Sequence, residues 1–116
     1  MSYIFYYSDH TFSNYRDLNK TLHRDYDKPA VYDELGYKVY YQNGLIHRDN
    51  DKPAKIFSNN EMHWFREGKK HRIYGPAFIS AAGFAEWWID GKHCKKRWIY
   101  EIRKFWYLIK EKYGRN

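Results

Sequence analysis

Ile46-His47-Arg48-Asp49-Asn50-Asp51-Lys52-Pro53-Ala54 is the stretch that decides the fold, because the chain contains three versions of it. Residues 22–30 differ from it at two positions and begin 24 residues earlier. Residues 70–77 begin 24 residues later and are one residue shorter, since Gly75 replaces the Asp-Lys pair. Self-similarity at a fixed period indicates one small supersecondary unit that is used several times.

An aromatic pair and a glycine turn precede each His-Arg position in the later units. Asn-Gly, Glu-Gly and Asp-Gly favour hairpin turns because glycine adopts positive φ at low cost. The spacing predicts about three to four β-hairpin units of 23–24 residues over residues 20–94, with atypical first and last units. The structural repeat positions are His23, Arg24, His47, Arg48, His71, Arg72, Gly44, Gly68 and Gly91, and the aromatic pairs are Tyr40-Tyr41, Trp64-Phe65 and Trp87-Trp88.

The two ends of the chain lie outside this array. Residues 1–19 predict a leading strand, residues 3–7, followed by an irregular connection. Over residues 95–116, apolar side chains recur at i, i+4, i+7 and i+11, which predicts an amphipathic helix that covers the end or face of the sheet. We therefore predict one mainly β domain over residues 1–116: a single elongated antiparallel sheet of repeated hairpins with a C-terminal basic helix. The predicted apolar stripe is Trp98, Ile102, Phe105 and Ile109.

Charge and composition narrow the class of protein. Of the net charge of +7, residues 95–116 carry +6, from eight Lys or Arg against two Glu. The 13 Tyr, 7 Phe and 5 Trp argue against a disordered chain. Cys94 is the only cysteine, so no internal disulfide is expected and a reducing compartment is favoured. With no signal peptide and no long apolar run, we expect a soluble, cytoplasmic protein without a transmembrane segment.

The units resemble a variant of the MORN repeat (membrane occupation and recognition nexus). Its pattern runs from an aromatic pair through Gly and His-Arg to Pro-Ala; residues 40–54 follow it throughout, residues 64–77 in shortened form and residues 87–94 in truncated form. Similar arrays are frequent in proteins of tailed phages and large DNA viruses, and look related to repeats in bacterial antitoxin-like proteins. The resemblance covers residues 20–94 and implies a meandering sheet of hairpins and protein contacts, not an activity.

Several motifs invite a catalytic or metal interpretation, but the repeat explains them better. The two His-Arg-Asp triplets are similar to the kinase catalytic loop, yet the chain is short and lacks a glycine-rich phosphate loop. The four equivalent His and Cys positions lie about 10 Å apart along a hairpin array, too far for one zinc ion. We expect a ladder of hydrogen-bonded histidines, with Asp25, Asp27, Asp49 and Asp51 in turns and salt bridges. We predict no enzyme, metal or cofactor; a hydrolase that uses the His and Asp rows is a third hypothesis.

Protein binding is the function that the sequence favours. Because side chains alternate along a strand, one aromatic of each pair is expected to be exposed as an interface row. The leading hypothesis is a non-enzymatic phage or viral protein that binds and inhibits a host enzyme or defence factor. A nucleic-acid or acidic-surface binder is the alternative, and residues 3–7 offer a strand for a homodimer. The predicted partner-binding residues are Tyr40, Tyr41, Trp64, Phe65, Trp87, Trp88, Arg103, Lys104, Lys110 and Lys112.

Overall fold

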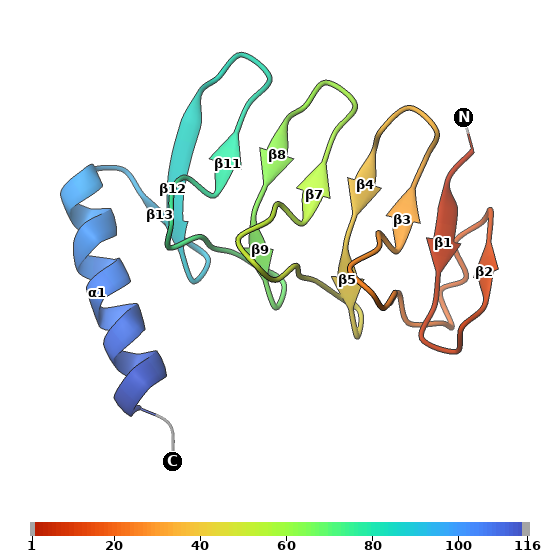
Figure 1. Ribbon diagram of the computed structural model, residues 1–116, viewed down its shortest axis with the longest axis horizontal. Coiled ribbons are helices and arrows are strands. Elements are labelled where there is room, and N and C mark those ends of the chain that lie inside the picture. Colours follow the sequence, from red (N-terminus) through yellow and green to blue (C-terminus); the bar gives the residue numbers. More distant parts are fainter. Residues whose placement is uncertain (1, 115–116) are drawn as a thin grey trace.

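The protein is a row of antiparallel hairpins followed by one helix, as Figure 1 shows. The computed structural model describes residues 2–114. Nine strands form the main sheet in the order β13-β12-β11-β8-β7-β4-β3-β1-β2, which confirms the mainly β hairpin fold with a C-terminal helix. The molecule is a slab of 44 × 41 × 22 Å. The elements are β1 (Ile4–Tyr6), β2 (Phe12–Ser13), β3 (Val31–Tyr32), β4 (Lys38–Val39), β5 (Tyr41–Gln42), β6 (Leu45–Ile46), β7 (Lys55–Ile56), β8 (Met62–His63), β9 (Phe65–Arg66), β10 (Lys69–Lys70), β11 (Phe78–Ile79), β12 (Ala85–Ile89), β13 (Lys92–Cys94) and α1 (Arg97–Tyr113).

The glycine turns form the tight hairpins that the sequence predicts. Two of them close separate two-stranded ladders, β5 with β6 and β9 with β10. The φ angles are 52° and 83° at Asn43-Gly44, 50° and 83° at Glu67-Gly68, and 51° and 78° at Asp90-Gly91. Positive φ at both central residues is the type I′ geometry of two-residue hairpins, whose twist matches that of the flanking strands.

The alanine of each Pro-Ala dipeptide is fully buried where neighbouring strands meet. The Ala54 N–H donates to the His63 carbonyl at 2.8 Å, and the Ala54 carbonyl accepts the Tyr40 N–H at 2.8 Å. Ala30 and Ala77 make the equivalent bonds in their own units. All three are 0 % exposed, so a side chain larger than a methyl group has no room at this position.

The first unit begins at Tyr6, earlier in the chain than the glycine spacing indicates. The Tyr6 N–H donates to the Ala30 carbonyl and the Tyr6 carbonyl accepts the His23 N–H, a pattern that the first aromatic of the two following pairs repeats. Tyr6-Tyr7 is therefore the aromatic pair of this unit. A longer connection, residues 8–20, takes the place of the two-residue turn.

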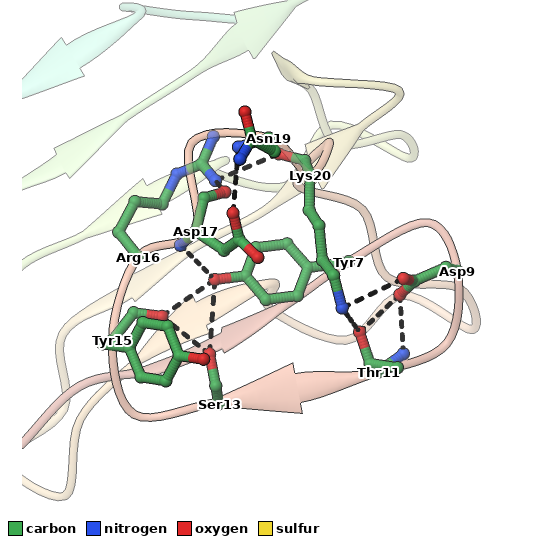
Figure 2. A network of polar contacts seen from close by, with 9 residues as sticks. All are labelled: Tyr7, Asp9, Thr11, Ser13, Tyr15, Arg16, Asp17, Asn19 and Lys20. Atoms are coloured by element: carbon green, nitrogen blue, oxygen red, sulfur yellow. Dashed lines mark hydrogen bonds and ion pairs between the residues drawn. The ribbon is translucent and has the colours of Figure 1, made fainter.

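Side-chain hydrogen bonds hold this longer connection, as Figure 2 shows. The hydroxyl of the buried Tyr7 accepts the Asp17 N–H at 2.8 Å. Asp9 accepts the Thr11 N–H at 3.0 Å and pairs with Lys20 at 3.1 Å. Hydrogen bonds from Thr11, assisted by Lys20, lower the pKa of Asp9 to about 2. The connection thus forms an ordered cap on the first unit.

The apolar core is divided between the two ends of the array. The cluster near the N-terminus is Tyr7, Leu22, Val31 and Val39, with Phe5, Tyr37, Tyr41 and Ile46 packed against it. The cluster near the C-terminus is Ile89, Cys94 and Tyr100, with Ile73, Trp87, Ile99 and Tyr107 around it. Helix α1 supplies part of the second cluster, so it belongs to the folded domain. Across residues 2–114, no helix has the length and apolar character needed to cross a membrane.

Candidate interaction surface

A row of arginines links each repeat unit to the unit before it. Arg48 donates to both carboxylate oxygens of Asp27, at 2.8 and 3.3 Å, and to the Pro53 carbonyl at 3.1 Å. Its guanidinium carbon lies 3.8 Å from the centre of the Tyr40 ring. Arg72 makes the same three kinds of contact one unit later. Two-pronged, charge-assisted hydrogen bonds and stacking on an aromatic ring fix a side chain firmly, so these arginines are structural.

The histidines form the ladder that the sequence predicts, and they bridge consecutive units. His23 Nδ1 accepts the Asn43 N–H of the following turn at 3.0 Å. Its Nε2 therefore carries the ring proton and donates to Asp25 at 2.8 Å. His47 repeats both contacts one unit later. His71 keeps the contact to the next turn, but no aspartate stands two residues after it.

Helix α1 fills the space beside the shortened third loop. The buried Tyr100 shares its hydroxyl proton between the carbonyls of Arg72, at 3.0 Å, and Gly75, at 3.3 Å. The ring of Tyr107 lies 4.4 Å from that of His71. The loss of the loop aspartates therefore coincides with the arrival of two tyrosines from the helix. The replacement of the loop aspartates by helix tyrosines ends the array, because the third loop offers no Asp to pair with the arginine of a following unit.

The face of α1 that contacts the sheet consists mainly of tyrosine and arginine side chains, with Ile99 packed beside them. Tyr100, Arg103 and Tyr107 recur at i, i+3 and i+7 and lie on one side of the helix. Arg103 donates to the carbonyl of His93, at the last hairpin, at 2.9 Å. Tyr100 is 1 % exposed, and its burial raises the pKa of the hydroxyl. The helix is attached by hydrogen bonds, by tyrosine rings and by the packing of Ile99.

The predicted apolar stripe of α1 does not cover the sheet; it faces solvent. The reason is that Tyr100 and Tyr107 match the carbonyls and the histidine at the end of the array, which an aliphatic stripe would leave unpaired. We call this stripe and its neighbours the outer face of α1. The exposed fractions are 61 % for Trp98, 50 % for Ile102, 56 % for Phe105, 63 % for Trp106 and 67 % for Tyr113, and the half-buried Ile109 completes the outer face.

The expectation of an exposed row among the aromatic pairs is wrong. Tyr40 and Trp64 are buried, and Tyr41, Phe65, Trp87 and Trp88 are half-buried. Cations cover these rings: the Arg72 guanidinium lies 4.0 Å from the Trp64 ring, and Lys70 Nζ lies 5.9 Å from Phe65 and 5.0 Å from Trp88. The aliphatic stems of long basic side chains shield aromatic surface from water. Helix α1 differs from these pairs, because four of its aromatic side chains are exposed on one face.

The four cations predicted to contact a partner are divided by their burial. Arg103 is half-buried and bonded to the last hairpin. Lys104 is half-buried, pairs with Glu101 at 3.4 Å and lies beside the Tyr100 ring. Lys110 and Lys112 are exposed. The positive charge available to a partner on this helix is therefore concentrated in its last turn.

The cleft beside α1 is lined by charges of both signs. A cleft of about 290 Å³ lies between α1 and the neighbouring turns. Three cations and three carboxylates line it, together with His71 and Tyr107. Among residues 2–114, no three His, Cys, Asp or Glu side chains are placed to hold a metal ion. The buried Cys94 thiol lies 3.6 Å from the Lys92 carbonyl and 3.6 Å from Arg103 Nη1.

Comparisons with known proteins give no assignment: no family model, no curated protein and no solved structure matches the chain. The resemblance to MORN repeats therefore rests on the residues quoted above and stays a prediction.

Proposed function

We propose that the protein is a non-enzymatic interaction module that binds a protein partner through the outer face of α1. The observation that carries the proposal is the exposure of five large apolar side chains on the side of the helix that faces away from the sheet. Contiguous apolar surface of this kind on a soluble domain marks an interaction site.

The repeat array acts as a rigid support for this helix. Its histidines and arginines are engaged with neighbouring units, and its aromatic pairs are covered. Tryptophan, phenylalanine and isoleucine on one helix face are residue types that anchor protein interfaces. The sequence hypothesis of a viral protein that inhibits a host factor needs such a surface, although it names no target.

Affinity capture from a lysate, with matched surface variants, tests this proposal. The chain with Ile102→Ser and Phe105→Ser is compared with a control that carries Leu35→Ser and Phe84→Ser. Leu35 and Phe84 are also exposed, at 57 % and 75 %, but lie in the loops that connect β3 to β4 and β11 to β12.

We expect the wild type and the loop control to retain the same protein after nuclease treatment and moderate salt, and the helix variant to lose it. Retention by the helix variant would contradict the proposal. Release of all bound material by nuclease would favour the alternative of nucleic-acid binding, because phosphate contacts depend steeply on salt.

A further inference from the structure

The outer face of α1 has the spacing of a helix–helix seam. Trp98, Ile102, Phe105 and Ile109 are separated by four, three and four residues, and this alternation of four- and three-residue steps is the spacing of the apolar seam between two packed helices. Trp106 and Tyr113 border this seam on one side. A helix of 17 residues is about 25 Å long, so the seam is long enough for three turns of a partner helix.

We propose that the outer face of α1 binds an acidic amphipathic helix of another protein. This inference rests on the proposed function and specifies the partner: an apolar stripe that packs into the seam, flanked by Asp or Glu side chains. The spacing argues for a helical occupant, since anchors at i, i+4 and i+7 are the pattern of a helix that docks on an apolar surface.

The charge of the helix argues for an acidic occupant. With about 100° per residue, Lys112 lies beside the seam, about 50° from its centre, whereas Lys110 lies about 110° from it on the other side, next to the cleft between α1 and the array. Both are exposed. Within residues 2–114, neither lysine makes an ion pair. Carboxylates of a partner helix would meet Lys112 directly beside the seam and the field of Lys110 further around the helix, which accelerates the association of the two helices.

The same charges argue against a second copy of this chain. Residues 95–116 carry a net charge of +6, so two copies would bring like charges together along the seam. Glu101 offers no compensation, because it already pairs with Arg97 at 3.2 Å and Lys104 at 3.4 Å. These two cations and Arg103 are engaged within the chain, which leaves the C-terminal lysines as the charges that select the partner.

The size of the seam sets the expected strength. Aromatic side chains bury roughly 150–250 Å² each, so the outer face buries on the order of 600 Å² per partner. This area is at the lower end of specific interfaces, and we expect a reversible complex that depends on both the apolar seam and the flanking charges.

Two designed helical peptides provide the probes. Both carry leucine at the seam positions; one carries Glu at the flanking positions and the other carries Lys. Each is labelled and titrated with the full chain, and binding is measured by fluorescence anisotropy. We expect the acidic peptide to bind at least about tenfold more tightly, which corresponds to 1.4 kcal/mol.

Variants of the chain separate the contribution of the apolar seam from that of the flanking lysines. Ile102→Ser with Phe105→Ser should weaken binding of the acidic peptide by about tenfold or more. Leu35→Ser with Phe84→Ser should leave the affinity for this peptide unchanged. Lys110→Glu with Lys112→Glu should reverse the preference, so that the basic peptide binds more tightly. Circular dichroism of each variant verifies that it is folded. All of the substituted positions except Leu35 and Phe84 lie on α1.

Several results would overturn the inference. Equal binding of the two peptides, or no reversal by the charge-swapped chain, would show that the lysines do not select the partner. Tighter binding to vesicles of phosphatidylserine and phosphatidylcholine than to the acidic peptide would identify a lipid surface instead. Sedimentation of the wild type as a dimer that the Ile102→Ser, Phe105→Ser variant dissociates would identify a second copy. If capture of a protein from the lysate depends on the outer face of α1 but the two peptides bind equally, the acidic helix is rejected as the partner. The proposed function of protein binding would then still hold.

Discussion

The loops of the repeat units and helix α1 use aromatic and basic side chains in opposite ways. In the loops, Arg48 stacks on Tyr40 and is fully engaged by a carboxylate and a carbonyl. On α1, Tyr100, Tyr107 and Arg103 are engaged. Its two tryptophans and the lysines of its last turn face water. The same residue types are therefore structural in one region and available for contacts in the other.

The difference lies in what surrounds each element. A repeat unit has a neighbour on both sides, so the rings of its aromatic pair and its histidine and arginine find partners of the same design. The terminal helix has a neighbour on one side only, and its apolar stripe is left outside. Exposure at the end of an array, and not residue type, is what identifies the candidate interaction surface.

The largest expected effect is the loss of one link in the arginine row. Arg48→Ala removes the two-pronged bond to Asp27, the bond to Pro53 and the stacking on Tyr40. The Arg48 side chain is 14 % exposed, so we expect a loss of about 3 kcal/mol in the free energy of unfolding. Urea denaturation measures this loss.

Arg97→Ala is the matched control, because the Arg97 side chain is 67 % exposed. Its pair with Glu101 is a surface ion pair, and we expect a change of less than about 0.5 kcal/mol. Equal losses for the two variants would show that the arginines of the loops contribute no more to stability than an arginine on the surface of α1.

The repeat contacts were predictable because each is tied to a short, recurring pattern. Asn43-Gly44 and its equivalents predicted the hairpin turns, and the recurring His-Arg predicted a ladder. The start of the first unit was not predictable from spacing, because residues 8–20 replace a glycine turn. Its signal was the pair Tyr6-Tyr7, which precedes a His-Arg dipeptide like the other pairs but at a greater distance.

A smaller effect is expected where the helix meets the array. Tyr100→Phe removes the hydroxyl that serves the carbonyls of Arg72 and Gly75. Tyr100 is buried, so water cannot replace this donor, and we expect a loss of about 1–2 kcal/mol in the free energy of unfolding. Tyr113→Phe, at an exposed position of the same helix, should change it by less than about 0.5 kcal/mol. A neutral Tyr100→Phe would show that the aromatic ring alone attaches the helix.

The orientation of α1 was the part that the sequence did not indicate. Periodicity predicts that Trp98, Ile102 and Phe105 share one face, and they do. It does not say whether that face or the opposite one meets the sheet. The hydrogen-bonding needs of the shortened third loop decide this, and they depend on carbonyls whose positions appear only in the folded array.

The smallest expected effect is a pH dependence that arises at the same junction. Burial lowers the pKa of His71, and the Arg66 cation adds to this, while Asp90 and Glu111 oppose it. The unfolded chain therefore takes up a proton near the ordinary histidine pKa of about 6.5, before the folded chain does. Stability should fall as the pH decreases from 7 to 5, and protonation would also break the bond from the Asp90 N–H to Nδ1.

His71→Asn isolates this contribution, because an asparagine oxygen can accept the same N–H without titrating. We expect the free energy of unfolding of this variant to change less between pH 7 and pH 5 than that of the wild type. His63, whose pKa is also lowered by burial, should account for part of the remaining slope, so His63→Asn should flatten it further. An unchanged pH profile in His71→Asn would mean that the imidazole is accessible to protons in the folded state, and the tyrosine face of α1 would then be a looser attachment than the arginine row.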